Sequence, residues 1–187
     1  MCGIVGYIGN KDAVPILLKG LQRLEYRGYD SAGISVMGTG GIQIVKQAGK
    51  VSELSKAVDD SPISGTIGIA HTRWATHGEP NNINAHPHTD ASETFSLVHN
   101  GIIENHTSLR TYLHEKGVSF KTETDTEVLV QLIGYLYQKE EISFEQAVRS
   151  ALQEVVGAYG IAVTCKDEQE TIIVARLGSP LVLGVGD

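Results

Sequence analysis

CGIVGYI, residues 2–8, is an apolar run that predicts a short strand at the start of the chain. Removal of Met1 would place the Cys2 thiol and a free α-amine on one residue. The reference pKa is about 8 for the amine and about 8.5 for the thiol, so the amine can take the thiol proton near neutral pH. This pattern indicates an N-terminal nucleophile with its own base. A small core cysteine in a first strand is the alternative interpretation.

The segments that follow this strand show both helical and strand periodicity. Asp12 is a candidate N-cap for a helix that continues to Leu24, and Thr124-x-x-Glu127 has the pattern of a capping box. Further helices are predicted over 51–59, 105–116, 126–138 and 143–154, and further strands over 31–37, 42–47, 66–72, 94–99, 160–165, 171–176 and 181–185. Strands gather at both ends of the chain with helices between them, which predicts an α+β fold with helix-covered sheets.

Length and charge narrow the possible functions. The 187 residues predict one domain. A net charge of −7 without a basic cluster disfavours nucleic acid and anionic membranes as partners. The longest apolar run, 155–163, is far below the about 20 residues that span a bilayer. No signal peptide is recognisable, and the two cysteines, which could form one disulfide, have no CxxC or zinc spacing, so we expect a protein of the reducing cytoplasm.

His99-Asn100-Gly101 follows an apolar strand and has the donors that acyl transfer requires. An Asn side-chain amide and a Gly backbone N–H can both point at a developing oxyanion. The motif therefore predicts an oxyanion hole at Asn100 and Gly101. An ordinary Asn-Gly turn is the alternative.

Arg73 and Asp125 have the two charges that a free α-amino acid requires. Arg binds a carboxylate in a bidentate manner, and a carboxylate binds an ammonium group. Arg73 follows a predicted strand, and Asp125 stands at a predicted helix start. The alternatives are a surface charge for Arg73 and a helix cap or dipole partner for Asp125.

The seven histidines do not show the spacing of a metal site. They contain no HExxH pattern, and zinc needs three or four defined ligands. The acidic run at 123–127 lacks the length and the central glycine of a calcium loop. The glycines match neither a P-loop nor a dinucleotide fingerprint. We therefore expect neither a metal nor a cofactor.

Taken together, six segments resemble one known family along the whole chain. They are CGIVGYIG at 2–9, LEYRGYDSAGI at 24–34, AHTRWATHGEP at 70–80, NAHPH at 84–88, HNGIIENH at 99–106 and ETDTE at 123–127. In order and spacing they are similar to the glutaminase domain of the glutamine–fructose-6-phosphate aminotransferases, which are class II glutamine amidotransferases. The resemblance implies an N-terminal-nucleophile hydrolase fold, a four-layer αββα sandwich.

The resemblance also implies catalytic roles. Cys2 would attack the side-chain amide of L-glutamine with its own α-amine as base, release ammonia and form a glutamyl thioester that water hydrolyses. Asn100 and the Gly101 N–H would hold the oxyanion. Arg27 would lie close to the N-terminal cysteine and help to organise it.

Substrate-binding roles follow from the same resemblance. Arg73, helped by Thr76, would bind the substrate carboxylate, and Asp125 would bind its ammonium group. Trp74, Thr76 and His77 would belong to a loop that closes over glutamine, and Trp74 would gate the passage of ammonia.

Finally, the resemblance implies a setting for the domain. Residues 1–187 would be a glutaminase domain that is truncated at its C-terminal end. Two sugar-phosphate isomerase-like domains that bind fructose 6-phosphate and form a homodimer would follow. Three alternatives stay open: a class II amidotransferase with another ammonia acceptor, a non-catalytic glutamine-binding module, and an autocatalytically processed amidase of the same fold.

Overall fold

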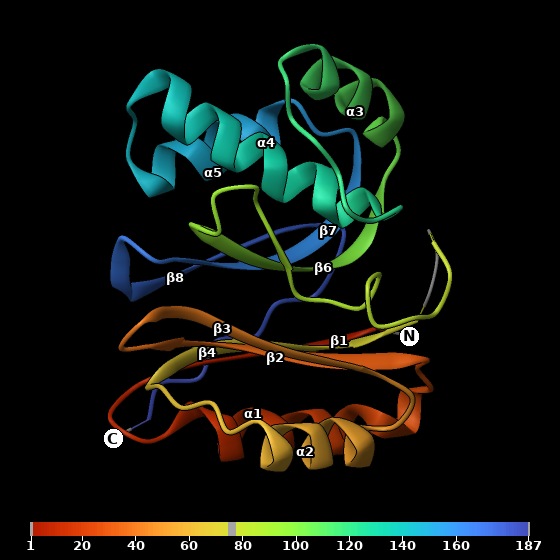
Figure 1. Ribbon diagram of the computed structural model, residues 1–187, viewed down its shortest axis with the longest axis vertical. Helices are drawn as coiled ribbons and strands as arrows, with labels where there is room; N and C mark the ends of the chain where they lie inside the picture. The colour runs from red at the N-terminus through yellow and green to blue at the C-terminus, as the bar shows by residue number, and fades with distance from the viewer. Residues whose placement is uncertain (1, 75–77, 187) are drawn as a thin grey trace.

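The computed structural model describes residues 2–74 and 78–186, with the backbone alone at Arg27. Within these ranges, two antiparallel four-stranded sheets lie face to face, and helices cover the outer face of each sheet (Figure 1). The order of layers is therefore helix, sheet, sheet, helix. This arrangement confirms the α+β class and the four-layer αββα sandwich.

The first sheet has the strand order β1-β4-β2-β3. Its strands are β1 (Gly3–Ile8), β2 (Ser31–Gly38), β3 (Gly41–Ala48) and β4 (Ile67–Arg73), and its outer face is covered by α1 (Ala13–Leu24) and α2 (Val51–Asp60). Asp12 caps α1 as predicted, since its carboxylate accepts a hydrogen bond from Val14 N at 3.1 Å. Leu17 and Leu21 of α1 pack with Ile34 of β2 in a fully buried core. Glu25–Arg27 forms a short 3₁₀ helix, η1, after α1.

The second sheet has the strand order β5-β6-β7-β8. Its strands are β5 (His88–Thr89), β6 (Phe95–Ile103), β7 (Gly157–Cys165) and β8 (Glu168–Leu177), and its outer face is covered by α3 (His106–Glu115), α4 (Asp125–Glu140) and α5 (Phe144–Gln153). The largest apolar cluster lies between this sheet and its helices. None of the helices in the described ranges is long and apolar enough to cross a membrane.

Strand alternation determines what lies between the two sheets. Ile69 of β4 packs there against Val98 of β6. Because side chains alternate along a strand, His71 and Arg73 share the face of Ile69, and Asn100 shares the face of Val98. The layer between the sheets is thus apolar in its middle and polar toward the end of β4.

One predicted strand is absent and another extends further than predicted. Residues 181–185 form no strand, and in the described part of the chain no strand pairs with them. Their apolar side chains are largely exposed, with Val182 at 89%, so composition alone does not make a strand without a partner edge. The strand predicted over 94–99 instead continues to Ile103, because β6 stays paired with β7 as far as Ile103 opposite Gly157. The remaining predicted elements agree with the structure within a few residues.

The capping box predicted at Thr124 is half present. The Thr124 hydroxyl accepts a hydrogen bond from Glu127 N at 3.1 Å, as predicted. The Glu127 carboxylate, however, accepts hydrogen bonds from Lys121 N at 2.8 Å and Thr122 N at 2.7 Å. This buried carboxylate therefore holds the segment that leads into α4. A complete capping box lies at Ser143, which the sequence analysis did not identify.

We expect the Glu127 carboxylate to be a major contributor to stability. Hydrogen bonds to a charged group contribute about 1.5–3 kcal/mol each. Glu127→Ala should therefore lower the free energy of unfolding by at least about 2 kcal/mol in urea titrations. Glu145→Ala is the control, since this glutamate near the start of α5 pairs with Arg149 at a surface where such pairs contribute about 0–1 kcal/mol. Equal losses for the two variants would contradict the prediction.

Candidate active site

Cys2 lies at the start of β1, next to the end of β4. The antiparallel register places Gly3 opposite Thr72, so Cys2 is adjacent to Arg73 and Trp74. Cys2 Sγ accepts a hydrogen bond from Trp74 N at 3.1 Å. Burial raises the pKa of the Cys2 thiol, and the Trp74 N–H opposes this effect. A thiol with a raised pKa is protonated at neutral pH and needs a base before it can attack.

Asn100 reaches Cys2 from the second sheet. Its Nδ2 donates to the carbonyl oxygen of Cys2 at 3.3 Å, and its Oδ1 lies 2.7 Å from His71 Nε2. Residues 100 and 101 lie inside β6, which excludes the Asn-Gly turn. Gly101 has φ +133°, and a Cβ there would lie 2.0 Å from the carbonyl oxygen of Ala158. Only glycine fits this position.

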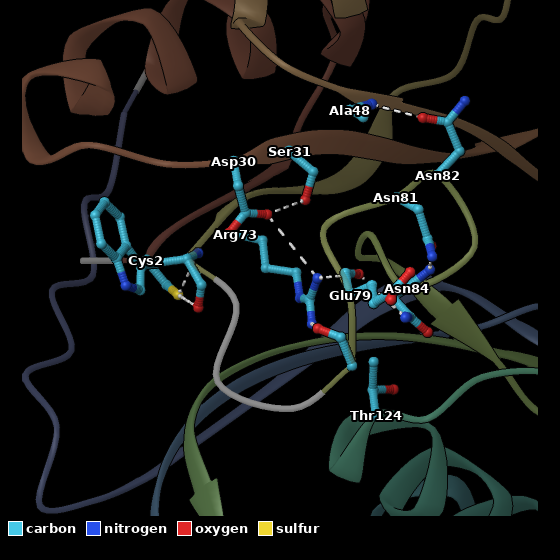
Figure 2. Close-up of polar contacts among 12 residues, drawn as sticks. Cys2, Asp30, Ser31, Ala48, Arg73, Glu79, Asn81, Asn82, Asn84 and Thr124 are labelled. Atoms are coloured by element: carbon cyan, nitrogen blue, oxygen red, sulfur yellow. Dashed lines mark hydrogen bonds and ion pairs between the residues drawn. The ribbon is translucent and has the colours of Figure 1, made fainter.

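Arg73 is buried between the sheets, so the surface-charge interpretation is wrong. Its side chain is 4% exposed. One guanidinium nitrogen lies 3.9 Å from the Asp30 carboxylate, and the two terminal nitrogens donate to the carbonyl oxygens of Glu79 and Gly78 at 3.3 and 3.2 Å. Figure 2 shows the side chain extending from beside Asp30 toward Glu79. Arg73 therefore links β4 to the loop that follows it.

That loop is attached to both halves of the molecule. Asn84 Nδ2 donates to Glu79 O at 3.1 Å, and Asn84 Oδ1 accepts from Glu123 N at 3.2 Å (Figure 2 shows Asn84 beside Glu79). On the side of the first sheet, Lys46 Nζ donates to Ile83 O at 3.0 Å. Burial lowers the pKa of Lys46 to about 8. These contacts hold the backbone that faces Arg73.

Asp125 is the first residue of α4 and is buried. Its Oδ2 accepts a hydrogen bond from Ile103 N at 2.9 Å, so the carboxylate is attached to the end of β6. Arg110 of α3 donates to the carbonyl oxygens of Thr122 and Thr124 at 3.1 and 3.0 Å, which holds the segment before the helix. The helix start is thus fixed from both sides.

One cavity of about 1310 Å³ opens between these elements. The sequence-predicted site residues that line it are Cys2, Arg73, Trp74, Asn100, Gly101 and Asp125. The cavity extends well beyond them, to the 179–186 segment. Two other predicted residues, Thr76 and His77, lie outside the described residues, and so does the side chain of Arg27.

Sequence reasoning missed three contributors to this site. Asp30 pairs with Arg73, Asn84 holds the loop, and His71 contacts Asn100. From the sequence, His71 was considered only as a metal ligand, and in the described ranges no three His, Cys, Asp or Glu side chains form a group suited to a metal. The predicted strand over 66–72 places 69 and 71 on one face, with Arg73 just beyond it, which indicates that His71 faces the site but not that it contacts Asn100.

Comparison with known proteins identifies relatives of the whole chain. Residues 71–184 match the family model of the glutamine amidotransferase domain. The chain is 57% identical, over its full length, to a glutamine–fructose-6-phosphate aminotransferase (isomerising) of Bacteroides thetaiotaomicron, and it spans 31% of that protein. It is 51% identical to the protein of the same name in Chlorobaculum tepidum, again over 31% of the relative. The chain thus spans about a third of the length of these curated relatives.

Solved structures agree with the sequence relatives. The glutamine phosphoribosylpyrophosphate amidotransferase of B. subtilis superposes with a TM-score of 0.79 and 28% identity, over 94% of this chain and 37% of that one. The fold of the chain is therefore that of the N-terminal-nucleophile hydrolases.

We expect the close approach at Gly101 to tolerate no side chain. Gly101→Ala would push a methyl group into the Ala158 carbonyl and separate β6 from β7, so the free energy of unfolding and the reactivity of the site should both fall. Gly117→Ala is the matched control, because Gly117 also has a positive φ but has open space around its Cβ position. Thermal melts should show a larger loss for Gly101→Ala, and equal losses would mean that φ alone is responsible.

Proposed function

This chain belongs to the glutamine amidotransferase domain family, and on that premise we propose that it hydrolyses the side-chain amide of L-glutamine to glutamate and ammonia. The observation that carries the proposal is the contact between Asn100 Nδ2 and the Cys2 carbonyl at 3.3 Å. It brings an amide donor from one sheet to the candidate nucleophile on the other. Acyl transfer needs this pairing of nucleophile and oxyanion donor.

The steps follow from the residues around Cys2. After removal of Met1, the α-amine takes the thiol proton and Sγ attacks the amide carbon of glutamine. Asn100 Nδ2 and the Gly101 N–H stabilise the oxyanion. The tetrahedral intermediate collapses, the amine returns its proton to the leaving nitrogen, and ammonia departs. Water then attacks the thioester, which releases glutamate and regenerates the thiol.

Substrate recognition is assigned to the charges that line the same cavity. The Arg73 guanidinium would bind the α-carboxylate and Asp125 the α-ammonium group, so that the side-chain amide extends toward Cys2. Thr76 would support the carboxylate. Trp74 and His77 would belong to the closing loop that excludes water. For Arg27 we propose a role in organising the N-terminal cysteine.

The identity of the relatives supports a specific ammonia acceptor. The relatives named glutamine–fructose-6-phosphate aminotransferase are up to 57% identical, against 28% for the phosphoribosylpyrophosphate amidotransferase. We therefore propose that residues 1–187 act as the glutaminase unit of such an aminotransferase, whose sugar-phosphate isomerase-like domains take the ammonia, bind fructose 6-phosphate and form a homodimer. Because both cysteines are free thiols, we also propose that the protein functions in the reducing cytoplasm.

Labelling with an electrophilic glutamine analogue tests the nucleophile. We expect the Met1-free protein to gain the mass of one adduct, and the peptide that begins with Cys2 to carry it. Cys2→Ala should gain none and should lose glutaminase activity, whereas Cys165→Ser, which changes the buried cysteine in β7, should react as the wild type does. A Met1-free protein that takes up no analogue and releases no ammonia would refute the proposal.

Asp125 should control substrate affinity through its charge. Asp125→Asn keeps an oxygen that can accept the bond from Ile103 N but removes the negative charge. We expect KM for glutamine to rise by about 10–100-fold, with a smaller change in kcat and an unchanged melting temperature. Asp167→Asn, on the surface of the second sheet, serves as the charge-matched control. An unchanged KM in Asp125→Asn would exclude Asp125 from binding the ammonium group.

A further inference from the structure

We propose that His71 is a positioning residue, whose neutral Nε2–H holds the Asn100 side chain so that its amide NH₂ is presented to Cys2. The inference rests on the proposed function, because it concerns the oxyanion donor of the same site. His71 Nε2 bonds to the Asn100 side chain, so its effect on Cys2 is carried by Asn100.

The hydrogen-bond geometry determines which end of the Asn100 amide faces Cys2. The Cys2 carbonyl oxygen can only accept, so the group 3.3 Å from it must be the NH₂ of Asn100. The amide oxygen then points the other way, to His71 Nε2 at 2.7 Å. An amide oxygen can only accept, so Nε2 of His71 must carry the proton. If the amide were flipped, the Asn100 oxygen would face the Cys2 carbonyl oxygen, and two acceptors would meet without a hydrogen between them.

The surroundings of His71 maintain this tautomer. The ring is fully buried, and burial lowers the pKa of His71 to about 3, so the ring is neutral. Its Nδ1 has no hydrogen-bond partner among the described residues. With Nε2 donating to the Asn100 oxygen, the neutral ring carries its single proton there, and no buried N–H of the ring is left without a partner.

His86 holds the ring in place. Its imidazole stacks on that of His71, with ring centroids 4.2 Å apart and 25° between the planes. His86 Nδ1 in turn accepts from the backbone N–H of His99, the residue before Asn100, at 3.4 Å. The stack therefore links β4 to the same stretch of β6 that carries the oxyanion donor. Burial also keeps the pKa of His86 well below its usual range, so no like charge pushes the rings apart.

A double-mutant cycle tests the inference. His71→Phe keeps a ring in the stack and removes the donor. We expect it to lower kcat for glutamine hydrolysis by about 10²-fold, close to the effect of Asn100→Ala, with a much smaller change in KM. In the Asn100→Ala background the same change should lower kcat less than about threefold, because a residue that acts only through Asn100 has nothing left to position.

Conservative variants separate positioning from folding. His71→Gln places an amide N–H near the position of Nε2 and should keep kcat within about tenfold of wild type, whereas His71→Asn is too short to reach Asn100 and should fall about 10²-fold. This pair carries the test if His71→Phe does not fold. Equal kcat for the Gln and Asn variants, or equal effects of His71→Phe with and without Asn100, would overturn the inference.

These experiments distinguish a failure of the His71 inference from a failure of the proposed function. If the wild-type protein neither hydrolyses glutamine nor takes up the analogue at Cys2, the proposed function fails. If the wild type is active and the two substitutions simply add, only the role of His71 is refuted.

Discussion

The antiparallel pairing of β1 with β4 is the constraint on which the site depends. It places Cys2 beside the last residues of β4, so that the thiol meets the Trp74 N–H and the Arg73 side chain starts from the neighbouring strand. A slip of one residue would turn every side chain of β1 to the opposite face of the sheet. The apolar contacts of β1 and the position of the candidate nucleophile are therefore determined by the same register.

Residue types and spacing predicted the α+β class and most elements, and they marked as candidates five residues that line the cavity, namely Cys2, Arg73, Asn100, Gly101 and Asp125, whereas Trp74 came from the family resemblance. They failed where a partner decides the outcome. Among the described residues no strand edge pairs with the apolar segment 181–185, and Glu127 bonds to Lys121 and Thr122 in place of its own N-cap. His71 was missed for a related reason. Its role depends on a residue 29 positions away on the other sheet, and no local pattern encodes that contact.

The charged side chains of the site have partners that offset the free-energy cost of their burial. A buried guanidinium is expensive unless it is paired and hydrogen-bonded, and Arg73 has Asp30 and two loop carbonyls around it. The nearby histidines stay neutral, because burial and the Arg73 charge both lower the pKa values of His71 and His86. On the side of Cys2 and Asn100, the cavity thus presents the Arg73 guanidinium and the Asp125 carboxylate, a pattern that suits a zwitterionic amino acid.

In the part of the chain that the structure describes, no strand pairing joins the two sheets, although the proposed reaction needs a group from each. Cys2 immediately precedes β1 of the first sheet and Asn100 lies in β6 of the second, and Ile69 packs against Val98 between the sheets. Apolar packing at Ile69 and Val98 resists separation but is not directional. Hydrogen bonds are directional, and Asn100 makes one to each of two elements of the first sheet, at Cys2 and at His71. The hydrogen bonds at the polar end of this layer can therefore determine how the two sheets are oriented relative to each other, which the apolar packing in the middle does not determine.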